Sequence, residues 1–414
     1  MLYHDSHDVK YREPLGPIAA GQALRLRFQC DESENVTLRT WDGTEKRTPM
    51  HSVGGHLFEA SITLPDRPML FWYDFIIHRT DGDARYGTSY DQLGGVGAYY
   101  HGQPHSYQVT VYDPAYSTPE YLRHGVIYQI FPDRFFRDKA GVKGRVRKVA
   151  AAHPDATFHE SWDEAPTLDI DPDNGDNRAL DFFGGTLRGI RQKLDYLKGL
   201  GVSVLYLNPI FRARTNHRYD TGSYEEIDPI AGDDAAFDEL VFAARDRGIR
   251  VMLDGVFSHT GADSKYFNRF GRYDTLGAYQ STDSPYFSWY RFDEYPNRYN
   301  TWWGFDTLPA VEKENESYQR YLLDPEDGIL PGWVRRGACG WRLDVADELP
   351  MPMLRRMRGA VKGADADAVL LGEVWEDASN KTAYGVNRSY CLGDMLDSVM
   401  NYPLRCAVID FFTG

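Results

Sequence analysis

The sequence predicts an α/β protein in which an amino-terminal β-sandwich precedes a domain built on a parallel sheet. Residues 1–112 contain short stretches of alternating apolar residues, such as 24–28 and 36–41, separated by Asp-Gly and Gly-Gly turns. From residue 126 onward, short and continuously apolar segments alternate with amphipathic helical segments. That alternation is typical of strands that are buried on both faces of a parallel sheet. Residues 113–125 are expected to form a linker.

Residues 126–414 are expected to hold six buried strands joined by helices. Helices are predicted over residues 187–200, 234–247 and 351–361. Two long stretches rich in aromatic and charged residues, 137–184 and about 255–315, follow the first and third strands. Loops of that length are usually functional or form a small subdomain. The predicted strands are 126–131, 202–207, 249–254, 340–345, 368–373 and 398–402.

The composition excludes several classes of protein. The 46 Lys and Arg residues against 61 Asp and Glu residues give a formal net charge of −15, which argues against binding to nucleic acid or to an anionic membrane. No apolar run reaches the roughly 20 residues that span a bilayer, and the first residues lack the profile of a secretory signal. The 4 cysteines are scattered without metal-like spacing. A reduced, cytoplasmic protein is the simplest interpretation.

Charged side chains end three of the predicted strands, where a (β/α)8 barrel would place its active site. The third strand ends at Asp254, the fourth carries Arg342 and Asp344 on one face, and the fifth ends at Glu373. Taken singly, Arg342–Asp344 is better interpreted as a buried ion pair and Glu373 as a capping or loop carboxylate. Three acidic strand ends in succession favour a catalytic site instead.

The chemistry that suits these carboxylates is retaining glycoside hydrolysis. That reaction needs one ionised and one protonated carboxyl group, about 5–5.5 Å apart. We expect the guanidinium of Arg342 to keep Asp344 ionised as a nucleophile. We expect apolar surroundings that include Trp375 to keep a proton on Glu373.

The chain resembles glycoside hydrolases of the α-amylase superfamily, family 13, and especially the neopullulanase, cyclomaltodextrinase and amylopullulanase-like group. The resemblance implies a (β/α)8 (TIM) barrel and an α-glucan hydrolase that cuts α-1,4 bonds, with α-1,6 bonds left open, in maltooligosaccharides, cyclodextrins, pullulan or starch. The amino-terminal domain is similar to the starch-binding-like module of this group. No organic cofactor, nucleic acid or membrane partner is implied. The matching segments are 128–135, 183–190, 206–210, 217–221, 254–259, 340–345 and 372–375.

The resemblance also assigns roles to residues. It implies that Asp344 is the nucleophile, that Glu373 is the general acid/base and that Arg342 orients Asp344. Paired Trp302 and Trp303 stack on glucose rings or simply pack in the core, and both interpretations stay open. The expected substrate-binding residues are Arg342, His259, Asp254, Tyr219 as an aromatic platform, His217 and Trp375.

Two departures from the family pattern stand out. Ser258 occupies the place of the usual Asn before His259, and Thr186 replaces an acidic residue that often helps to bind calcium. The Asp-rich stretch 169–176 offers oxygen ligands for Ca²⁺, but it lacks the glycine and glutamate placement of an EF-hand loop. A solvated acidic loop is the favoured interpretation, and no metal ligands are assigned.

The family's third acid, an Asp preceded by His after the seventh strand, has no counterpart between Glu373 and Gly414. We therefore expect a barrel truncated after about six strands, without strands seven and eight. The alternative function is a non-catalytic α-glucan-binding fragment. A homodimer in which a partner subunit completes the site also stays open.

Overall fold

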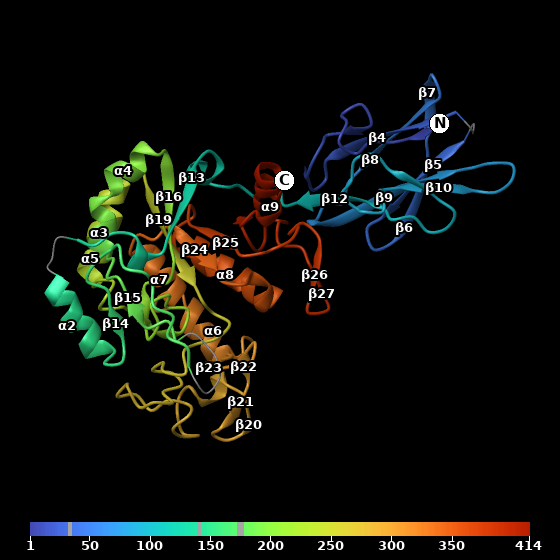
Figure 1. Cartoon of the computed structure of the whole chain (residues 1–414). Coiled ribbons are helices and arrows are strands. Elements are labelled where there is room, and N and C mark those ends of the chain that lie inside the picture. Colours follow the sequence, from blue (N-terminus) through green and yellow to red (C-terminus); the bar gives the residue numbers. More distant parts are fainter. Residues whose placement is uncertain (32–34, 139–141, 172–177) are drawn as a thin grey trace. The chain divides into compact units, whose positions relative to one another are not determined.

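The computed structural model describes residues 1–31, 35–138, 142–171 and 178–414, which divide into two compact units (Figure 1). The first unit comprises Met1–Ser117 together with Glu376–Met395. The second comprises Thr118–Trp375 together with Leu396–Gly414. Across the described parts of the chain, no helix combines the length and the apolar character needed to cross a bilayer.

The first unit contains two larger sheets, in which every pairing except β3 with β12 is antiparallel. The five-stranded sheet consists of β1 (Leu2–Tyr3), β2 (Arg12–Glu13), β4 (Ala23–Cys30), β7 (His51–Gly54) and β8 (Leu57–Thr63). The seven-stranded sheet consists of β3 (Ile18–Ala19), β5 (Val36–Trp41), β6 (Glu45–Pro49), β9 (Met69–Ile77), β10 (Ala84–Gly87), β11 (Ala98–Tyr100) and β12 (Tyr107–Tyr112).

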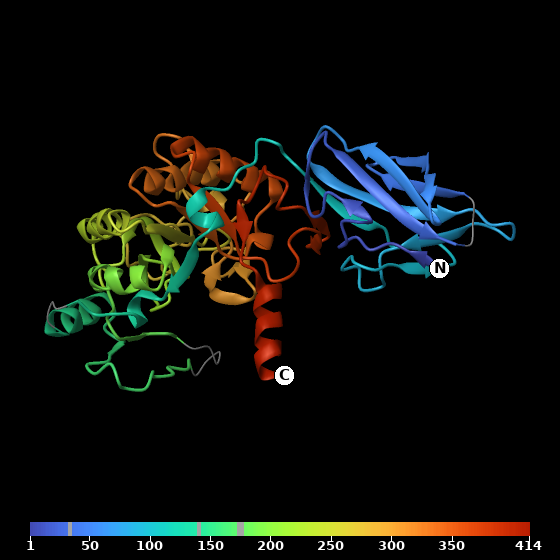
Figure 2. The same cartoon turned by 90° about the horizontal axis from the view of Figure 1, so that it is seen from above.

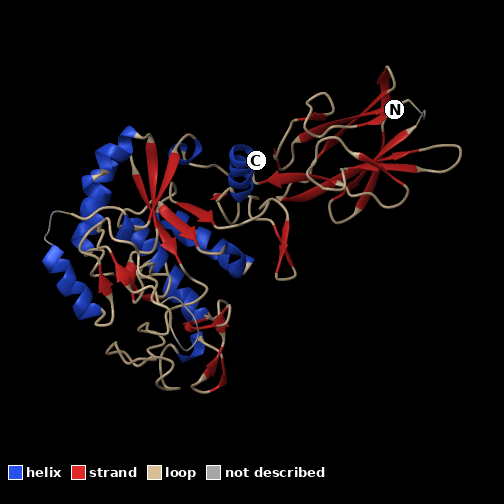
Figure 3. Cartoon of the chain, in the orientation of Figure 1, coloured by secondary structure: helices blue, strands red, loops and turns tan. Residues whose placement is uncertain are grey.

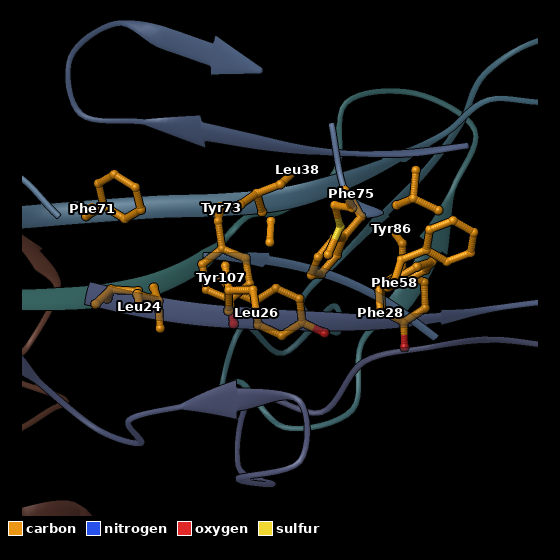
Figure 4. Close-up of a cluster of buried hydrophobic side chains, with 14 of the residues drawn as sticks. Leu24, Leu26, Phe28, Leu38, Phe58, Phe71, Tyr73, Phe75, Tyr86 and Tyr107 are labelled. Carbon is orange, nitrogen blue, oxygen red and sulfur yellow. The ribbon is translucent and has the colours of Figure 1, made fainter. Parts of the chain in front are cut away.

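Side chains from both sheets form one hydrophobic core (Figure 4). Strand β4 alternates strictly, so that Leu24, Leu26 and Phe28 are buried while the residues between them are partly exposed. Period-two alternation is what a strand needs when one face packs on a core and the other meets solvent. The ring of Phe28 stacks on Phe75 of β9 with centroids 4.6 Å apart, which joins the two sheets.

Residues 376–395 belong to the first unit, although the sequence predicts an unbroken catalytic segment from 126 to 414. This return segment contains the hairpin β26 (Lys381–Ala383) and β27 (Val386–Arg388). The amide of Asp113 donates to the carbonyl of Leu392 at 2.9 Å, and the Gln108 amide donates to the Ser379 hydroxyl at 3.2 Å. Such bonds join residues more than 270 positions apart, so local patterning does not reveal them.

The second unit is built on a curled parallel sheet with the order β13–β16–β19–β24–β25–β28 (Figure 3). The strands agree with the six predicted ones, apart from shifts of a few residues at their ends. Helices α4, α5 and α8 pack against β16, β19 and β25, respectively. The strands are β13 (Val126–Ile130), β16 (Val202–Leu207), β19 (Arg250–Gly255), β24 (Gly340–Leu343), β25 (Val369–Gly372) and β28 (Ser398–Val399).

The helices of this unit follow the predicted order. The predicted helix 187–200 is divided at Lys193, and the last helix extends away from the sheet (Figure 2). The α-helices are α1 (Glu120–Arg123), α2 (Val142–Ala152), α3 (Leu187–Gln192), α4 (Leu194–Gly199), α5 (Asp234–Arg245), α6 (Glu316–Leu323), α7 (Ile329–Arg335), α8 (Met351–Ala364) and α9 (Tyr402–Thr413).

Short elements occupy the connections after β13, β16, β19 and β24. They include the 3₁₀ turns η1 (Pro132–Arg134), η2 (Phe287–Trp289) and η3 (Ala346–Glu348). The two-stranded pairs are β14 (Thr157–Phe158) with β15 (Asp181–Phe182), β17 (Phe211–Ala213) with β18 (Thr221–Ile227), β20 (Phe292–Glu294) with β21 (Arg298–Tyr299), and β22 (Thr301–Trp302) with β23 (Phe305–Pro309). The last two pairs lie in the long stretch predicted over 255–315.

Candidate active site

The acidic strand ends meet because β19, β24 and β25 are parallel neighbours in register. Asp254 lies opposite Arg342, and Leu343 lies opposite Gly372, so Asp344 and Glu373 leave their strands side by side. The amide of Glu373 donates to the carbonyl of Leu343 at 3.0 Å, so the pairing of β24 with β25 continues as far as Glu373. The sheet therefore gathers the predicted residues at its carboxyl edge.

The guanidinium of Arg342 joins three carboxylates. Its Nη1 donates to both oxygens of Asp254, at 2.9 and 3.0 Å, and to Oδ1 of Asp344 at 3.0 Å. Its Nη2 lies 2.6 Å from Oε2 of Glu373. All four side chains are almost fully buried. One positive charge is thus shared among three acidic groups in a site that excludes most water.

This sharing changes the expected ionisation of Asp344. Burial raises the pKa of the Asp344 carboxyl to about 8, and the charges of Asp254 and Glu373 act in the same direction, against the opposing effect of Arg342. Burial likewise raises the pKa of Asp254. The expected effect of Arg342, which is to keep Asp344 ionised, is thus opposed by burial and by two neighbouring carboxylates that share the same guanidinium.

Four donors surround the carboxylate of Glu373. Oε2 accepts from Arg342 and from the backbone amide of Val345, the latter at 2.9 Å. Oε1 accepts from the indole of Trp375 at 3.1 Å and from the Tyr402 hydroxyl at 3.3 Å. Guanidinium, backbone amide and indole N–H groups cannot accept a hydrogen bond, whereas a hydroxyl can both donate and accept one. The proton that a general acid carries therefore belongs on Oε1, next to Tyr402.

Sequence reasoning missed both Val345 and Tyr402. Tyr402 falls inside the predicted sixth strand, but β28 ends at Val399 and Tyr402 opens α9. Asn401 caps that helix by accepting from the Leu404 amide at 3.1 Å, so an Asn-x-Pro helix start was the available sequence pattern. Val345 adopts φ 37° and ψ 71°, a left-handed conformation that is rare for a β-branched residue. No sequence pattern announces it.

Asp254 accepts hydrogen bonds that hold other side chains of the site in place. Besides Arg342, its Oδ2 accepts from the Tyr206 hydroxyl and from the Tyr219 hydroxyl, the latter at 2.9 Å. Its carboxylate is fully buried and does not line the cavity. The sugar contact expected for Asp254 is therefore replaced by a structural role, in which it fixes Arg342 and the phenol of Tyr219.

The two predicted histidines are held as neutral donors. Nε2 of His259 lies 3.1 Å from the Tyr219 carbonyl, which can only accept, so Nε2 carries the proton. Nδ1 then accepts from Ser258 at 3.0 Å, which gives the family-atypical serine a function. Burial lowers the pKa of His259 to about 3. Nδ1 of His217 accepts from the Tyr219 amide at 3.1 Å, and burial lowers the pKa of His217 as well.

A cavity of about 880 Å³ opens over these side chains. This volume lies within the range of small-ligand sites, about 300–1,000 Å³. Its walls include Trp302, whose ring lies 4.8 Å from that of His259. Of the predicted residues, the cavity is lined by His217, Tyr219, His259, Arg342, Asp344, Glu373 and Trp375.

A metal centre is not evident among the described residues, where no three His, Cys, Asp or Glu side chains are grouped to hold an ion. Residues 172–176 of the Asp-rich stretch lie outside the described part of the chain. Asp169 pairs with Arg178 at 2.7 Å. Thr186 caps α3, because its hydroxyl accepts from the Gly189 amide at 2.9 Å.

Comparison with known proteins agrees with this geometry. The family model "Alpha amylase, catalytic domain" matches residues 129–414. The chain is 38% identical to an amylopullulanase of Thermoanaerobacter thermohydrosulfuricus, over 99% of this chain and 30% of that protein. It is 33% identical to a cyclomaltodextrinase of Thermoanaerobacter pseudethanolicus, over 99% of this chain and 66% of the relative. The chain thus spans about a third of the amylopullulanase.

A solved structure gives the same picture. The cyclic α-maltosyl-(1→6)-maltose hydrolase of Arthrobacter globiformis aligns with a TM-score of 0.58 and 31% identity, over 71% of this chain and 58% of that chain. The family model and this solved structure each cover more than half of the chain.

The neutral state of His259 predicts a pH dependence of stability. In the unfolded chain His259 is protonated below its ordinary pKa of about 6.5. In the folded protein its pKa is about 3, so it stays neutral down to that pH. Stability is therefore intact above pH 6.5 and is lost as the pH falls, by up to about 1.4 kcal/mol per pH unit. Chemical denaturation between pH 7 and 4.5 should give a shallower slope for His259→Gln than for the native protein. The exposed residue His124 provides the control, and equal slopes for His259→Gln and His124→Gln would contradict the neutral assignment.

Proposed function

The chain belongs to the alpha-amylase family, and we propose that it is a retaining glycoside hydrolase that cleaves α-1,4-glucosidic bonds in maltooligosaccharides, cyclodextrins, pullulan or starch. The observation that carries the proposal is the pairing of Asp344 and Glu373 by one guanidinium at the wall of the cavity. Retaining hydrolysis requires two carboxyl groups that reach the same bond from different directions.

The reaction assigns one role to each carboxyl group. Glu373 donates the proton on Oε1 to the glycosidic oxygen while ionised Asp344 attacks the anomeric carbon, and a covalent glycosyl-enzyme forms as the leaving sugar departs. The ionised Glu373 then takes a proton from water, which releases the sugar with its α configuration kept. His259, His217 and Tyr219 line the cavity, and the Nε2 proton of His217 suits a hydrogen bond to a sugar hydroxyl.

Pullulan is included because the relative with 38% identity is named an amylopullulanase. Cleavage of α-1,6 bonds is thus the second linkage to test. Chromatography of the products from pullulan distinguishes the two linkages, because panose or isopanose arises from α-1,4 cleavage and maltotriose from α-1,6 cleavage. The same chromatogram reveals transglycosylation as products longer than the substrate.

Replacing either acid should remove activity. Asp344→Asn abolishes the release of reducing sugar from pullulan and maltooligosaccharides, because an amide cannot form the glycosyl ester. Glu373→Gln lowers kcat by about 10²–10⁴-fold, the usual contribution of a general acid. Asp274→Asn, an exposed aspartate in the stretch 255–315, is the control. Undiminished activity of Asp344→Asn contradicts the proposal, and hydrolysis that depends on Glu373 excludes a merely glucan-binding protein.

The charge of Asp254 predicts a shift in the pH profile. Asp254 raises the pKa of Asp344, so Asp254→Asn should favour ionised Asp344 and move the acidic limb of kcat/KM to lower pH. The absolute rate falls as well, because Asp254 also holds Arg342. Asp220→Asn removes another carboxylate of the cavity wall and should leave the limb in place. A limb that moves to higher pH in Asp254→Asn contradicts the assignment.

The first unit is proposed to bind the same class of glucan. It holds a cavity of about 520 Å³, lined largely by neutral side chains and by the half-buried indole of Trp72. Hydroxyl and amide groups pair with sugar hydroxyls, and an indole stacks on the apolar face of a sugar ring. The neutral polar residues of this wall include Ser106, Gln108, Thr110, Ser379 and Asn380.

Trp72 offers a test with a matched control. The test uses an Asp344→Asn background, which binds glucan without cleaving it. In that background, Trp72→Ala should weaken the binding of maltoheptaose to the first unit about tenfold and leave binding in the catalytic cavity unchanged, as measured by calorimetry. Trp41 lies opposite Trp72 in the neighbouring strand, is 49% exposed and does not line the cavity. Equal effects of Trp41→Ala and Trp72→Ala would contradict this second glucan site.

A further inference from the structure

The hairpin β22–β23 reaches toward the catalytic carboxylates with an unusual residue at its tip. Trp302 pairs with Phe305, so Trp303 and Gly304 form a two-residue turn, with φ values of 51° and 89°. Turns of this kind favour Asn or Gly at both positions because other side chains are strained there. A tryptophan in such a place, with 57% of its surface exposed, is best explained by a function of the indole.

The base of the hairpin is fixed to the His259 segment. The amide of Thr260 donates to the carbonyl of Pro309 at 3.1 Å, and the amide of Ala262 donates to that of Thr307 at 2.8 Å. His259 itself bridges to Ala310. Backbone bonds therefore set where the hairpin starts, but they leave its tip to be fixed by side chains.

The carboxylate of Glu348, in the connection after β24, fixes the tip next to the cavity that Trp302 and Trp375 line. The indole Nε1 of Trp303 donates to Oε1 of Glu348 at 3.0 Å, and the other carboxylate oxygen lies 4.0 Å from Nζ of Lys313. Glu348 ends η3, four residues after Asp344 in the sequence. The carboxylate of Glu348 is largely buried, whereas the indole that donates to it is largely exposed.

The bond completes a row of aromatic rings around the catalytic acids. Trp303 stacks on Trp302 with centroids 4.8 Å apart and an interplanar angle of 8°, and its edge meets Trp375 at 6.0 Å and 86°. Trp302 touches the ring of His259, and Trp375 donates to Glu373. The row thus runs from His259 to Glu373, and Trp303 is its most exposed ring.

We propose that Glu348 is a positioning residue that acts through Trp303. Its carboxylate holds the exposed indole as a stacking surface for a glucose unit near the glycosidic bond that is cleaved. The proposal rests on the α-glucan hydrolase function proposed above. A sugar face stacks on a rigid indole with little loss of side-chain freedom, which makes the Glu348 bond a determinant of preference for longer glucans.

Two pairs of variants test the bond and the ring separately. Trp303→Phe keeps a ring but loses the N–H group, and Trp303→Ala loses both. Glu348→Ala loses the acceptor, whereas Glu348→Gln keeps an acceptor oxygen and loses only the charge. We expect Glu348→Ala and Trp303→Phe to lower kcat/KM for maltoheptaose about tenfold and that for 4-nitrophenyl α-maltoside less than threefold. Glu348→Gln should recover most of the loss. Glu294→Ala, an exposed residue of the same connection, is the surface control.

The coupling between the residues decides the outcome. If Glu348 acts through Trp303, adding Glu348→Ala to Trp303→Ala should cause no further change in the ratio of the two kcat/KM values. A full additional loss in the double variant, or equal effects of Glu348→Ala on both substrates, overturns the proposal. Maltoheptaose affinity in the same variants, measured by calorimetry, carries the same test if turnover is absent. Absent turnover by the native protein contradicts the proposed hydrolysis instead, so the two failures are distinguishable.

Discussion

The guanidinium of Arg342 is the interaction on which the site depends. It is the shared partner of Asp254, Asp344 and Glu373, and its charge is not enough for all three. Burial alone lowers the pKa of an arginine, yet the surrounding negative charge holds the pKa of Arg342 above its ordinary value. The same imbalance favours a retained proton within the carboxylate group. At both Asp254 and Asp344, burial outweighs the opposing effect of the guanidinium, and the pKa of each carboxyl is raised.

The sheet makes this arrangement geometrically necessary. Strand β24 lies between β19 and β25, so a residue on β24 can reach acids on both neighbours. Gly340 begins β24 with φ 135°, and a Cβ atom at that position would lie 1.9 Å from the carbonyl oxygen of Val369. Only glycine permits this close approach of β24 to β25. The separation of Arg342 from Glu373 is therefore set at the start of the strand, two residues before the guanidinium.

The apolar period and the charged strand ends predicted the six strands of the parallel sheet and the residues at its carboxyl edge. Both features can be recognised in short stretches of sequence. They placed Arg342, Asp344 and Glu373 at the ends of successive strands. They misjudged Asp254, because a strand-end carboxylate looks the same whether it faces a cavity or lies beneath it. They also missed Tyr402 and the return of residues 376–395 to the first unit, since both depend on contacts between distant parts of the chain. Single-residue ionisation was equally inaccessible, because it depends on how many acids share one cation.

Backbone strain occurs at two residues that donate hydrogen bonds to acids in or beside the site. Val345 and Trp303 both lie in the left-handed region, at a cost of about 1–3 kcal/mol each, and both make a hydrogen bond to an acid. The strained amide of Val345 faces Oε2 of Glu373, which leaves Oε1 as the oxygen that can carry the proton. The strained turn at Trp303 aims an indole at Glu348. The stability of the parallel sheet offsets the cost of these two conformations. They fix which oxygen of Glu373 can carry the proton and how the ring of Trp303 is oriented.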